Sequence, residues 1–328
     1  MNQESILSIK QAVARYIDQV SLARSPNTAR TYSNALHAFL PVLSDHGIDP
    51  ETTRISNLSE DAVAWFASFL KNHSPSTERL YMTALAGFYH FIAAEEIASP
   101  NLTRVQLLIK QRTRRPGVRL PQFPERLIAI VINYANNLTL CAANDEASLL
   151  RNLRDRALML TLADTGLRVH EACALRRGDI DWNEGKAVII GKGDQQAVVR
   201  FSSRVLQSMR DYLTRRAALD GASGKPLASL PLFSRHDRGA GKKIKPITTA
   251  TARNIISQRV REAIGDQGDD NITPHSFRHY FVTTVLKASG NLKMAQELAR
   301  HRNIAVTQRY AHLSDDELDQ GYYEIFEK

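Results

Sequence analysis

Three short stretches near the C-terminal end direct the interpretation of the whole chain: TPHSFRHY (273–280), ARHR (299–302) and TQRYAH (307–312). Pro274 suits the first turn of a helix, because its missing N–H needs no partner there. His275 and Arg278, three residues apart, then point from the same face of that turn. Tyr310 follows 32 residues after Arg278. A phenol close to these groups would be a plausible nucleophile.

These stretches and two others further upstream form an ordered set. The matching residues are Thr165-Gly166-Leu167-Arg168, Lys192, His275 with Arg278, His301 and Tyr310. The set resembles the signature of the tyrosine recombinases, also called the phage integrase family, which includes the Xer-type site-specific recombinases. A single His-x-x-Arg pair would be weak support for this resemblance. Five elements in the family's order over about 145 residues are specific support for it.

The second histidine of the set stands in an unusual context. Its surroundings are Ala299-Arg300-His301-Arg302, where the commonest pattern of the family is Leu-Gly-His-Ser. The chain therefore places two cations beside His301.

The residue types suit cleavage of a phosphodiester, whose charge repels nucleophiles and whose alkoxide leaves poorly. Arg168 and Arg278 can clamp both non-bridging oxygens and stabilise the charge that develops in the transition state. His275 and His301 would add hydrogen bonds to the same oxygens, and either could help to remove the proton of Tyr310. Attack would give a 3′-phosphotyrosyl bond, and rejoining would need no nucleotide.

Two further residues are expected to support this chemistry. Gly166 permits a sharp turn that projects Arg168, and Glu171, three residues later, could hold its guanidinium in place. Two β-rich runs, 187–190 and 197–201, predict a hairpin with Lys192 near its tip. The resemblance implies that Lys192 is the catalytic lysine, which would protonate the departing 5′ oxygen.

The first hundred residues read as four amphipathic helices, two of which start at Ser25-Pro26 and Ser74-Pro75. This part resembles the family's helical DNA-clamping domain. Most of its apolar residues are expected to form a core. Exposed polar residues at two helix starts are candidate DNA contacts: Asn27, Thr28, Arg30, Thr77 and Arg79.

Residues 98–121 are interpreted as a basic linker in which Pro and Gly prevent a continuous helix. Its cations could simply keep the connector solvated, or they could lie along DNA phosphates, which we favour. The candidate contacts in this segment are Arg112, Arg114, Arg115 and Arg119. Residues 220–245, rich in Gly, Lys and Arg, read as a surface loop.

The expected fold is mainly α with a small β-hairpin or sheet, an α+β class. It comprises a four-helix SAM-like domain (1–97), the linker and a catalytic domain (122–328). Within the latter, residues 314–328 should form a short helix with one apolar stripe, which must be buried somewhere. The resemblance implies that this tail docks on a neighbouring protomer. The protein is therefore expected to form a homo-oligomer, specifically a tetramer, on paired DNA sites.

Composition supports this interpretation. The chain has 328 residues, of which 43% are hydrophobic and 23% charged, typical of a soluble globular protein with two domains. Residues 1–105 carry 8 Lys and Arg against 10 Asp and Glu, so residues 106–328 carry 35 against 24. A basic second half suits a polyanion such as double-stranded DNA. No apolar run of about 18 residues and no secretory signal are present, so we expect no membrane contact and a cytoplasmic, nucleoid-associated location.

No cofactor is expected, because the sequence lacks a Gly-x-x-x-x-Gly-Lys-Ser/Thr phosphate loop and a carboxylate cluster for two metals. His275 and His279 are four apart but have no third ligand at a convincing spacing, so no metal is assigned. The predicted function is cutting and rejoining of DNA at paired recombination sites. A type IB topoisomerase is less favoured, because of the hairpin, the His-to-Tyr spacing and the four-helix domain. The completeness of the catalytic set argues against a degenerate DNA-binding protein.

Overall fold

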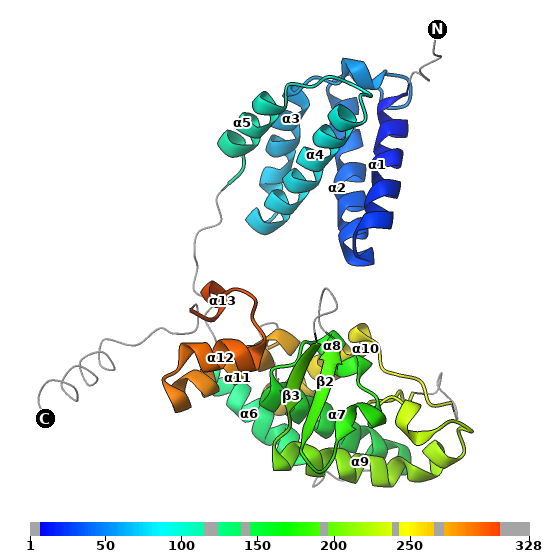
Figure 1. The fold of residues 1–328 in the computed structure, drawn as a ribbon, viewed down its shortest axis with the longest axis vertical. Helices are drawn as coiled ribbons and strands as arrows, with labels where there is room; N and C mark the ends of the chain where they lie inside the picture. The colour runs from blue at the N-terminus through cyan, green and yellow to red at the C-terminus, as the bar shows by residue number, and fades with distance from the viewer. Residues whose placement is uncertain are drawn as a thin grey trace, which may run out of the picture. The chain divides into compact units, whose positions relative to one another are not determined.

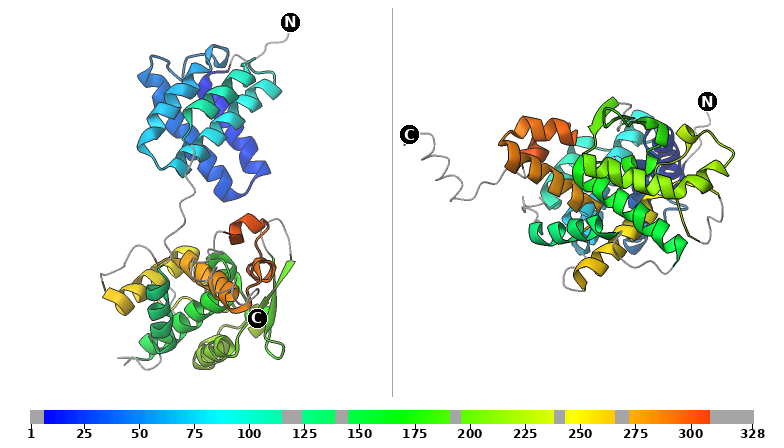
Figure 2. Two further views of the ribbon diagram at one scale, coloured as in Figure 1. Left: turned by 90° about the vertical axis from the view of Figure 1, so that its left-hand side faces the viewer. Right: turned by 90° about the horizontal axis from the view of Figure 1, so that it is seen from below.

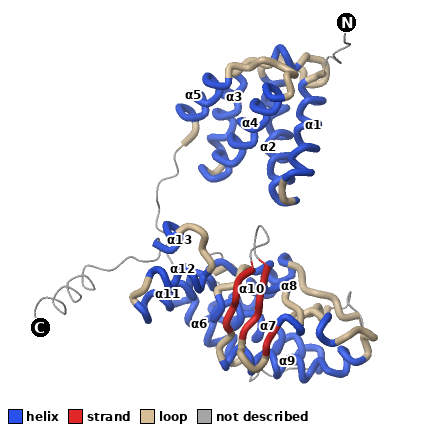
Figure 3. Tube along the Cα trace, in the orientation of Figure 1, coloured by secondary structure: helices blue, strands red, loops and turns tan. Residues whose placement is uncertain are grey.

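The computed structural model describes residues 7–114, 124–138, 145–190, 196–237, 243–265 and 272–308. The chain divides into two compact units, Met1–Arg119 and Leu120–Lys328, each with a hydrophobic core of its own (Figure 1). We call them the N-terminal and the C-terminal unit. Both are dominated by helices, and strands occur only in the described part of the C-terminal unit (Figure 3). The predicted mainly helical α+β class is confirmed.

The described part of the N-terminal unit contains five α-helices and two 3₁₀ turns. They are α1 (Ile9–Ala23), α2 (Pro26–Asp45), η1 (Ile55–Asn57), α3 (Asp61–Phe69), η2 (Leu70–Asn72), α4 (Pro75–Ala94) and α5 (Leu102–Arg112). Their apolar faces meet in one core, in which the rings of Phe39 and Phe66 pack edge to face at 5.3 Å between centroids. The amphipathic spacing thus buries one stripe of each helix, as expected.

Both predicted Ser-Pro helix starts are confirmed. The hydroxyl oxygens of Ser25 and Ser74 accept hydrogen bonds from the backbone N–H groups of Thr28 and Thr77, at 3.3 and 3.1 Å. Each proline occupies the first turn, where no N–H is needed. The chain therefore begins α2 and α4 with the same capped turn.

Helix α5 differs from the prediction, which treated residues from 98 onward as a linker without a continuous helix. Asn101 caps it by accepting a hydrogen bond from the N–H of Arg104 at 3.0 Å, and Val105 is fully buried in the core of the unit. The helix packs against α3 and α4. Pro116 and Gly117 come after its end and so cannot interrupt it.

The described part of the C-terminal unit is a set of helices with one small sheet. The elements are α6 (Glu125–Asn136), α7 (Glu146–Thr165), α8 (Val169–Ala174), η4 (Arg177–Asp179), β1 (Ile180–Asp181), β2 (Lys186–Ile190), β3 (Gln196–Arg200), α9 (Ser203–Gly221), η5 (Leu227–Ser229), α10 (Thr249–Ile264), α11 (Pro274–Ser289), α12 (Leu292–Ala299) and α13 (Ile304–Gln308). The long apolar helix expected after residue 146 is α7, which packs against α6, α9 and α11.

The two predicted β-rich runs pair as antiparallel strands, with Ala187 opposite Val199 and Ile189 opposite Ala197. The short strand β1 adds to β2, giving the order β1-β2-β3. The sheet lies along one side of the helices (Figure 2). Ala187 and Ile189 face the core, whereas Val188 and Ile190 are exposed, as strand alternation requires.

The segment after α9 was predicted as a surface loop, and this is wrong for its middle part. Leu230, Leu232 and Phe233 are almost completely buried and belong to the hydrophobic interior of the C-terminal unit. Arg216 on α9 fixes this stretch, because its guanidinium donates to the carbonyl oxygens of Pro231 and Leu232, both at 2.9 Å. The surface-loop prediction rested on the high content of Gly, Lys and Arg, which does not indicate which residues of the segment are buried.

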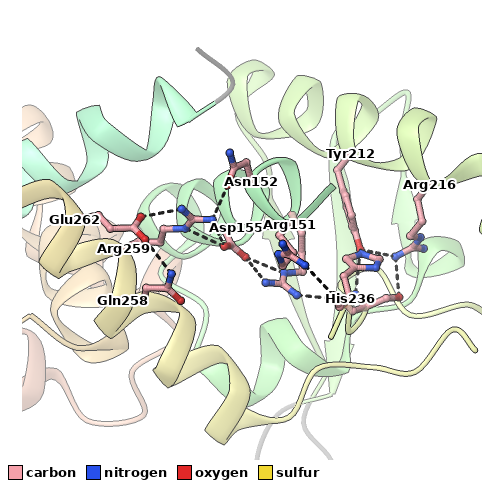
Figure 4. A network of polar contacts seen from close by, with 11 residues as sticks. Arg151, Asn152, Asp155, Tyr212, Arg216, His236, Gln258, Arg259 and Glu262 are labelled. Carbon is pink, nitrogen blue, oxygen red and sulfur yellow. Dashed lines mark hydrogen bonds and ion pairs between the residues drawn. The ribbon is translucent and has the colours of Figure 1, made fainter. Parts of the chain in front are cut away.

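A buried polar network ties α7 to α10 (Figure 4). Asp155 on α7 accepts from Arg154 Nε at 2.8 Å through Oδ1 and from Arg259 Nη2 at 2.7 Å through Oδ2. Arg259 also donates to Asn152 and to Glu262, both at 2.7 Å. Buried charges need such partners, so α10 is held to α7 by ion pairs as well as by apolar packing.

Candidate active site

The first site residue follows a turn that favours glycine. Helix α7 ends in Gly166, whose φ of 57° is in the left-handed region. A Cβ at Gly166 would lie 2.4 Å from a ring carbon of Phe281 on α11, so a side chain there would also clash. Leu167 is buried directly afterwards, and Arg168 stands at the N-terminus of α8. The predicted sharp turn before Arg168 is present.

Glu171 fixes Arg168 in place through two hydrogen bonds. Its side chain is 3% exposed, and its two oxygens accept from the backbone N–H of Arg168 at 2.8 Å and from Nη1 at 2.9 Å. Burial acts to raise the pKa of Glu171, but hydrogen bonds from Arg168 and the charge of Arg300 outweigh it and lower this pKa. The guanidinium of Arg168 remains 43% exposed. It is therefore fixed at one edge and accessible at the other.

Helix α11 supplies the His-x-x-Arg pair. Thr273 caps its start by accepting from the N–H of His275, and Pro274 fills the first turn. The His275 side chain is exposed, whereas Arg278 is almost completely buried. Arg278 donates to the carbonyl oxygens of Gly166 and Ala299. This arginine thus also joins the end of α7 to the end of α12.

A cavity of about 570 Å³ brings these groups together. Arg168, His275 and Arg278 all line it, as do residues from α10 that the sequence analysis did not select. Those α10 residues include Arg253, Asn254 and Ser257, all three with exposed side chains. The positions 253 and 257 are four apart, so a polar helix face was visible in the sequence, although nothing linked it to this site.

His301 follows the end of α12 and is 9% exposed. Its Nδ1 lies 2.8 Å from the hydroxyl of Thr307 on α13, and Gln296 donates to its carbonyl oxygen at 2.9 Å. If the Thr307 hydroxyl donates to Nδ1, then Nε2 carries the proton and can donate to a phosphate oxygen. Helices α12 and α13, which were not predicted, hold this ring.

Arginines surround the histidines and disfavour their protonation. Burial, followed by the charges of Arg278 and Arg168, lowers the pKa of His301 to about 4. Partial removal from water, followed by the charges of Arg278 and Arg168, also lowers the pKa of His275. Burial and the neighbouring His275 lower the pKa of His279 to about 4. An electropositive pocket with neutral imidazoles suits an anionic ligand.

We expect the ring of His301 to stay neutral down to about pH 5 in the free protein, against an unperturbed midpoint near 6.5. Added DNA should raise its midpoint, because phosphate charge offsets that of the arginines. Because the unfolded chain takes up this proton below about pH 6.5 and the folded site does not, stability should fall as the pH drops from 6.5 towards 4. Histidine NMR titration, assigned with a His301→Gln variant, checks this. A midpoint near 6.5 without DNA would contradict it.

Among the described residues, no group of three or more His, Cys, Asp or Glu side chains is arranged to hold a metal ion. His275 and His279 do contact one another, with ring centroids 4.8 Å apart in an edge-to-face arrangement. In the same part of the chain, no helix is long and apolar enough to cross a membrane.

Two catalytic candidates, Lys192 and Tyr310, lie outside the described residues, as does the tail at 314–328. Strands β2 and β3 end at Ile190 and begin at Gln196, so the chain on both sides of Lys192 is placed. Likewise, α13 ends at Gln308, two residues before Tyr310.

The DNA-contact candidates of the N-terminal unit lie on α2 and α4. Asn27, Arg30 and Arg79 are exposed, whereas Thr28 and Thr77 are partly buried. The hydroxyls of the two threonines lie 2.9 Å from those of the capping serines Ser25 and Ser74. The structure thus uses the threonines to build the helix starts and leaves the arginine side chains accessible.

The linker candidates separate into two kinds. Arg112 is exposed in the last turn of α5. Arg114 instead pairs with Glu78, a fully buried carboxylate, and donates to the carbonyl oxygen of His73 at 2.6 Å. Lys71 pairs with the same carboxylate at 2.7 Å. Arg114 therefore stabilises the N-terminal unit, and its predicted phosphate contact stays a prediction. Arg115 and Arg119 lie outside the described residues.

The chain matches two known protein families. Residues 136–317 match the phage integrase family, and residues 13–96 match the phage integrase N-terminal SAM-like domain. A protein named tyrosine recombinase XerC from Bacillus pumilus (strain SAFR-032) is 28% identical over 310 residues, 93% of this chain and 92% of that protein. The protein of the same name from Bacillus subtilis (strain 168) is 26% identical and covers 96% of each chain.

Solved structures show the same fold. A post-cleavage complex of the XerH site-specific recombinase bound to a palindromic difH substrate has a TM-score of 0.68 at 18% identity, covering 98% of this chain and 85% of that chain. A Tn1549 transposon integrase in complex with transposon right end DNA has a TM-score of 0.67 at 15% identity, covering 98% and 100%. Since the family match alone spans more than half of the sequence, the chain belongs to the phage integrase family, the tyrosine recombinases.

Proposed function

We propose that this protein is a site-specific recombinase that cuts and rejoins DNA strands through a transient 3′-phosphotyrosyl bond to Tyr310. The observation that carries the proposal is the cavity into which Arg168, His275 and Arg278 converge. Its lining offers the guanidiniums of Arg168, Arg253 and Arg278 and the imidazole of His275, and no carboxylate lines its described wall. A scissile phosphate is the ligand that this set suits best.

The arginines would stabilise the charge that grows on the non-bridging oxygens during attack. They are fixed beforehand, Arg168 by Glu171 and Arg278 by two backbone carbonyls, so little reorganisation is needed when the charge develops. His275 and His301 would donate hydrogen bonds to the same phosphate.

Tyr310 would attack the phosphorus, and its phenol, with a free pKa of about 10, must lose a proton as it does so. A neutral imidazole is able to take that proton. Lys192 would protonate the 5′ oxygen as its bond to phosphorus breaks. The phosphotyrosyl bond keeps the energy of the phosphodiester, and a 5′ hydroxyl from the partner strand would reverse the reaction.

The partner would be double-stranded DNA with paired recombination sites, held by a homo-oligomer, a tetramer. The N-terminal unit would clamp the duplex through Asn27, Arg30, Arg79 and Arg112, and the second unit would cleave it. The XerH and Tn1549 structures are complexes with DNA, and a λ integrase structure is a dimer on a core site. These complexes support a DNA partner and an oligomer on DNA; in our proposal the tail at 314–328 is exchanged between protomers. A cytoplasmic, nucleoid-associated location follows from such a substrate.

A catalytically degenerate DNA-binding protein would not need Glu171 beneath Arg168 or two arginines oriented into one cavity. A type IB topoisomerase remains less suited, because relatives that cover more than nine tenths of the chain are named as recombinases.

Trapping the covalent intermediate tests the proposal. The DNA site is first selected from a random duplex pool by the wild-type protein. A nick just beyond the scissile phosphate then lets the short 5′-hydroxyl fragment diffuse away, so the intermediate accumulates. We expect a protein–DNA band that survives denaturant, with chelator present, and a DNA-bearing peptide that contains Tyr310. A folded protein that binds the selected duplex but yields no such band contradicts the proposal.

We expect Arg168→Ala to slow single-turnover cleavage by roughly a hundredfold or more, since such a donor is worth about 3 kcal/mol in the transition state. DNA affinity should change much less. Arg204→Ala is the matched control, because Arg204 is 45% exposed and paired with Asp164, much as Arg168 is with Glu171. Arg204 does not line the described cavity, so its removal should leave the cleavage rate near wild type. Equal losses of cleavage and affinity in Arg168→Ala would mean that the arginine only anchors DNA.

A further inference from the structure

Arg300 has an unfavourable backbone conformation. It terminates α12 with φ 57° and ψ 43°, a left-handed geometry that glycine adopts readily and that side chains with a Cβ disfavour. Among the described residues other than glycine, only Glu96 shares a positive φ. Favourable contacts of Arg300 must therefore compensate for the strain of its left-handed backbone.

The side chain of Arg300 is also placed unfavourably. It is 11% exposed although it carries a positive charge, and within the described residues its buried Nε has no hydrogen-bond partner. Burying a cation is costly unless its contacts offset the loss of water. The compensation must come from the two terminal nitrogens of the guanidinium.

Those nitrogens join three structural elements. Nη2 donates to the carbonyl oxygen of Gly166 at 3.2 Å, and Nη1 donates to that of Leu298 at 3.1 Å. Both lie 3.4 Å from the carbonyl oxygen of Thr165, and Nη2 lies 3.7 Å from Glu171 Oε2. The guanidinium thus connects the end of α12 with the turn after α7 and with the carboxylate on α8.

Two of these partners, Gly166 and Glu171, also hold a proposed phosphate ligand. The carbonyl oxygen of Gly166 also accepts from Arg278, and Glu171 holds Arg168. His301 follows Arg300 directly in the chain. Both terminal nitrogens of Arg300 are engaged by the carbonyl oxygens of Leu298 and Gly166, so it acts on these ligands rather than on the phosphate.

We infer that Arg300 is a positioning residue, which locks Arg168, Arg278 and His301 into one fixed arrangement around the scissile phosphate. The inference rests on the proposed function, since that assigns the phosphate to these three side chains. The inference gives a functional role to Arg300, which is not one of the residues of the ordered catalytic set.

Single-turnover cleavage of the nicked duplex at saturating protein tests the inference. In Arg300→Gly the backbone strain is relieved, yet the guanidinium is lost. We expect cleavage to slow by about tenfold to a hundredfold, as misplacement of reacting groups by about 1 Å can cause, while the Kd for the duplex stays near wild type. Arg300→Lys keeps the charge but not the forked donor, so its rate should lie between the two. Arg302→Gln, an exposed neighbour, should cleave like wild type.

The pH dependence gives a second readout, because the charge of Arg300 lowers the pKa of Glu171 and also that of His301. Arg168 and Arg300 are the two cations whose charges lower the pKa of Glu171. Without Arg300 this pKa should rise, so Glu171 is protonated, and releases Arg168, at a higher pH. The decline of cleavage at acid pH should therefore begin at a higher pH in Arg300→Gly than in wild type or Arg302→Gln.

The possible outcomes distinguish failure of the inference on Arg300 from failure of the proposed function. Wild-type rate and pH profile in folded Arg300→Gly overturn the inference, as does a loss confined to Kd. If Arg300→Gly does not fold, the comparison passes to Arg300→Lys, which must be slower than wild type with unchanged Kd for the inference to stand. Arg168→Ala is measured alongside: if it cleaves normally, the proposed site fails, whereas a slow Arg168→Ala with normal Arg300 variants refutes only the role of Arg300.

Discussion

Tyr310→Phe should form no covalent protein–DNA complex and no recombinant product, while its affinity for the selected duplex stays close to wild type. The change removes one oxygen atom and leaves the ring. Without that oxygen no phosphotyrosyl bond can form. The loss should therefore exceed that of any single phosphate ligand, because the ligands lower a barrier whereas Tyr310 makes the bond.

The nicked duplex gives the measurement, with the strand that keeps the phosphate labelled at its 5′ end. Tyr322→Phe and Tyr323→Phe are the matched controls, since both tyrosines stand in the same C-terminal segment as Tyr310. Each should form the adduct like wild type. An adduct in Tyr310→Phe that disappears in a double variant with Tyr322→Phe or Tyr323→Phe would reassign the nucleophile.

Local sequence signals predicted much of the fold and the frame of the site. The Ser-Pro starts of α2 and α4 and the Gly166 turn each depend on residues within four positions of one another, so their physics is readable from the sequence. The pairing of Arg168 with Glu171 is of the same kind. In these cases a short stretch alone fixes the geometry.

Contacts between residues far apart in the chain were not predictable in this way. Arg114 looked like one cation in a basic linker, but it pairs with Glu78, 36 residues earlier. The signal for α5 is present in the sequence, because Asn101 precedes apolar residues at helical spacing, although the cations of this segment are also typical of a solvated linker. Arg300 shows the further limit. Its left-handed backbone and its contacts with Thr165 and Gly166 exist only once α7 and α12 have packed.

The buried network in Figure 4 leads to the second large expected effect. Asp155→Ala should lower the free energy of unfolding of the C-terminal unit by about 3–5 kcal/mol, the usual cost of removing one partner from a buried ion pair. Asp155 has a side chain that is 5% exposed, between Arg154 at 7% and Arg259 at 11%. Without it, two guanidiniums face one another with the shared carboxylate gone, and α10 loses its ionic link to α7.

Urea unfolding followed by tryptophan fluorescence measures this effect. The chain has two tryptophans, so in a Trp65→Phe background Trp182, which packs against the core of the C-terminal unit, reports that unit alone. Glu146→Ala is the matched control, because Glu146 is also on α7 and pairs with Arg215, but these side chains are 62% and 48% exposed. An exposed pair contributes at most about 1 kcal/mol, so this variant should unfold close to wild type. If Asp155→Ala and Glu146→Ala unfold at the same urea concentration, the network does not hold α10 in place, and apolar packing alone positions the α10 wall of the cavity.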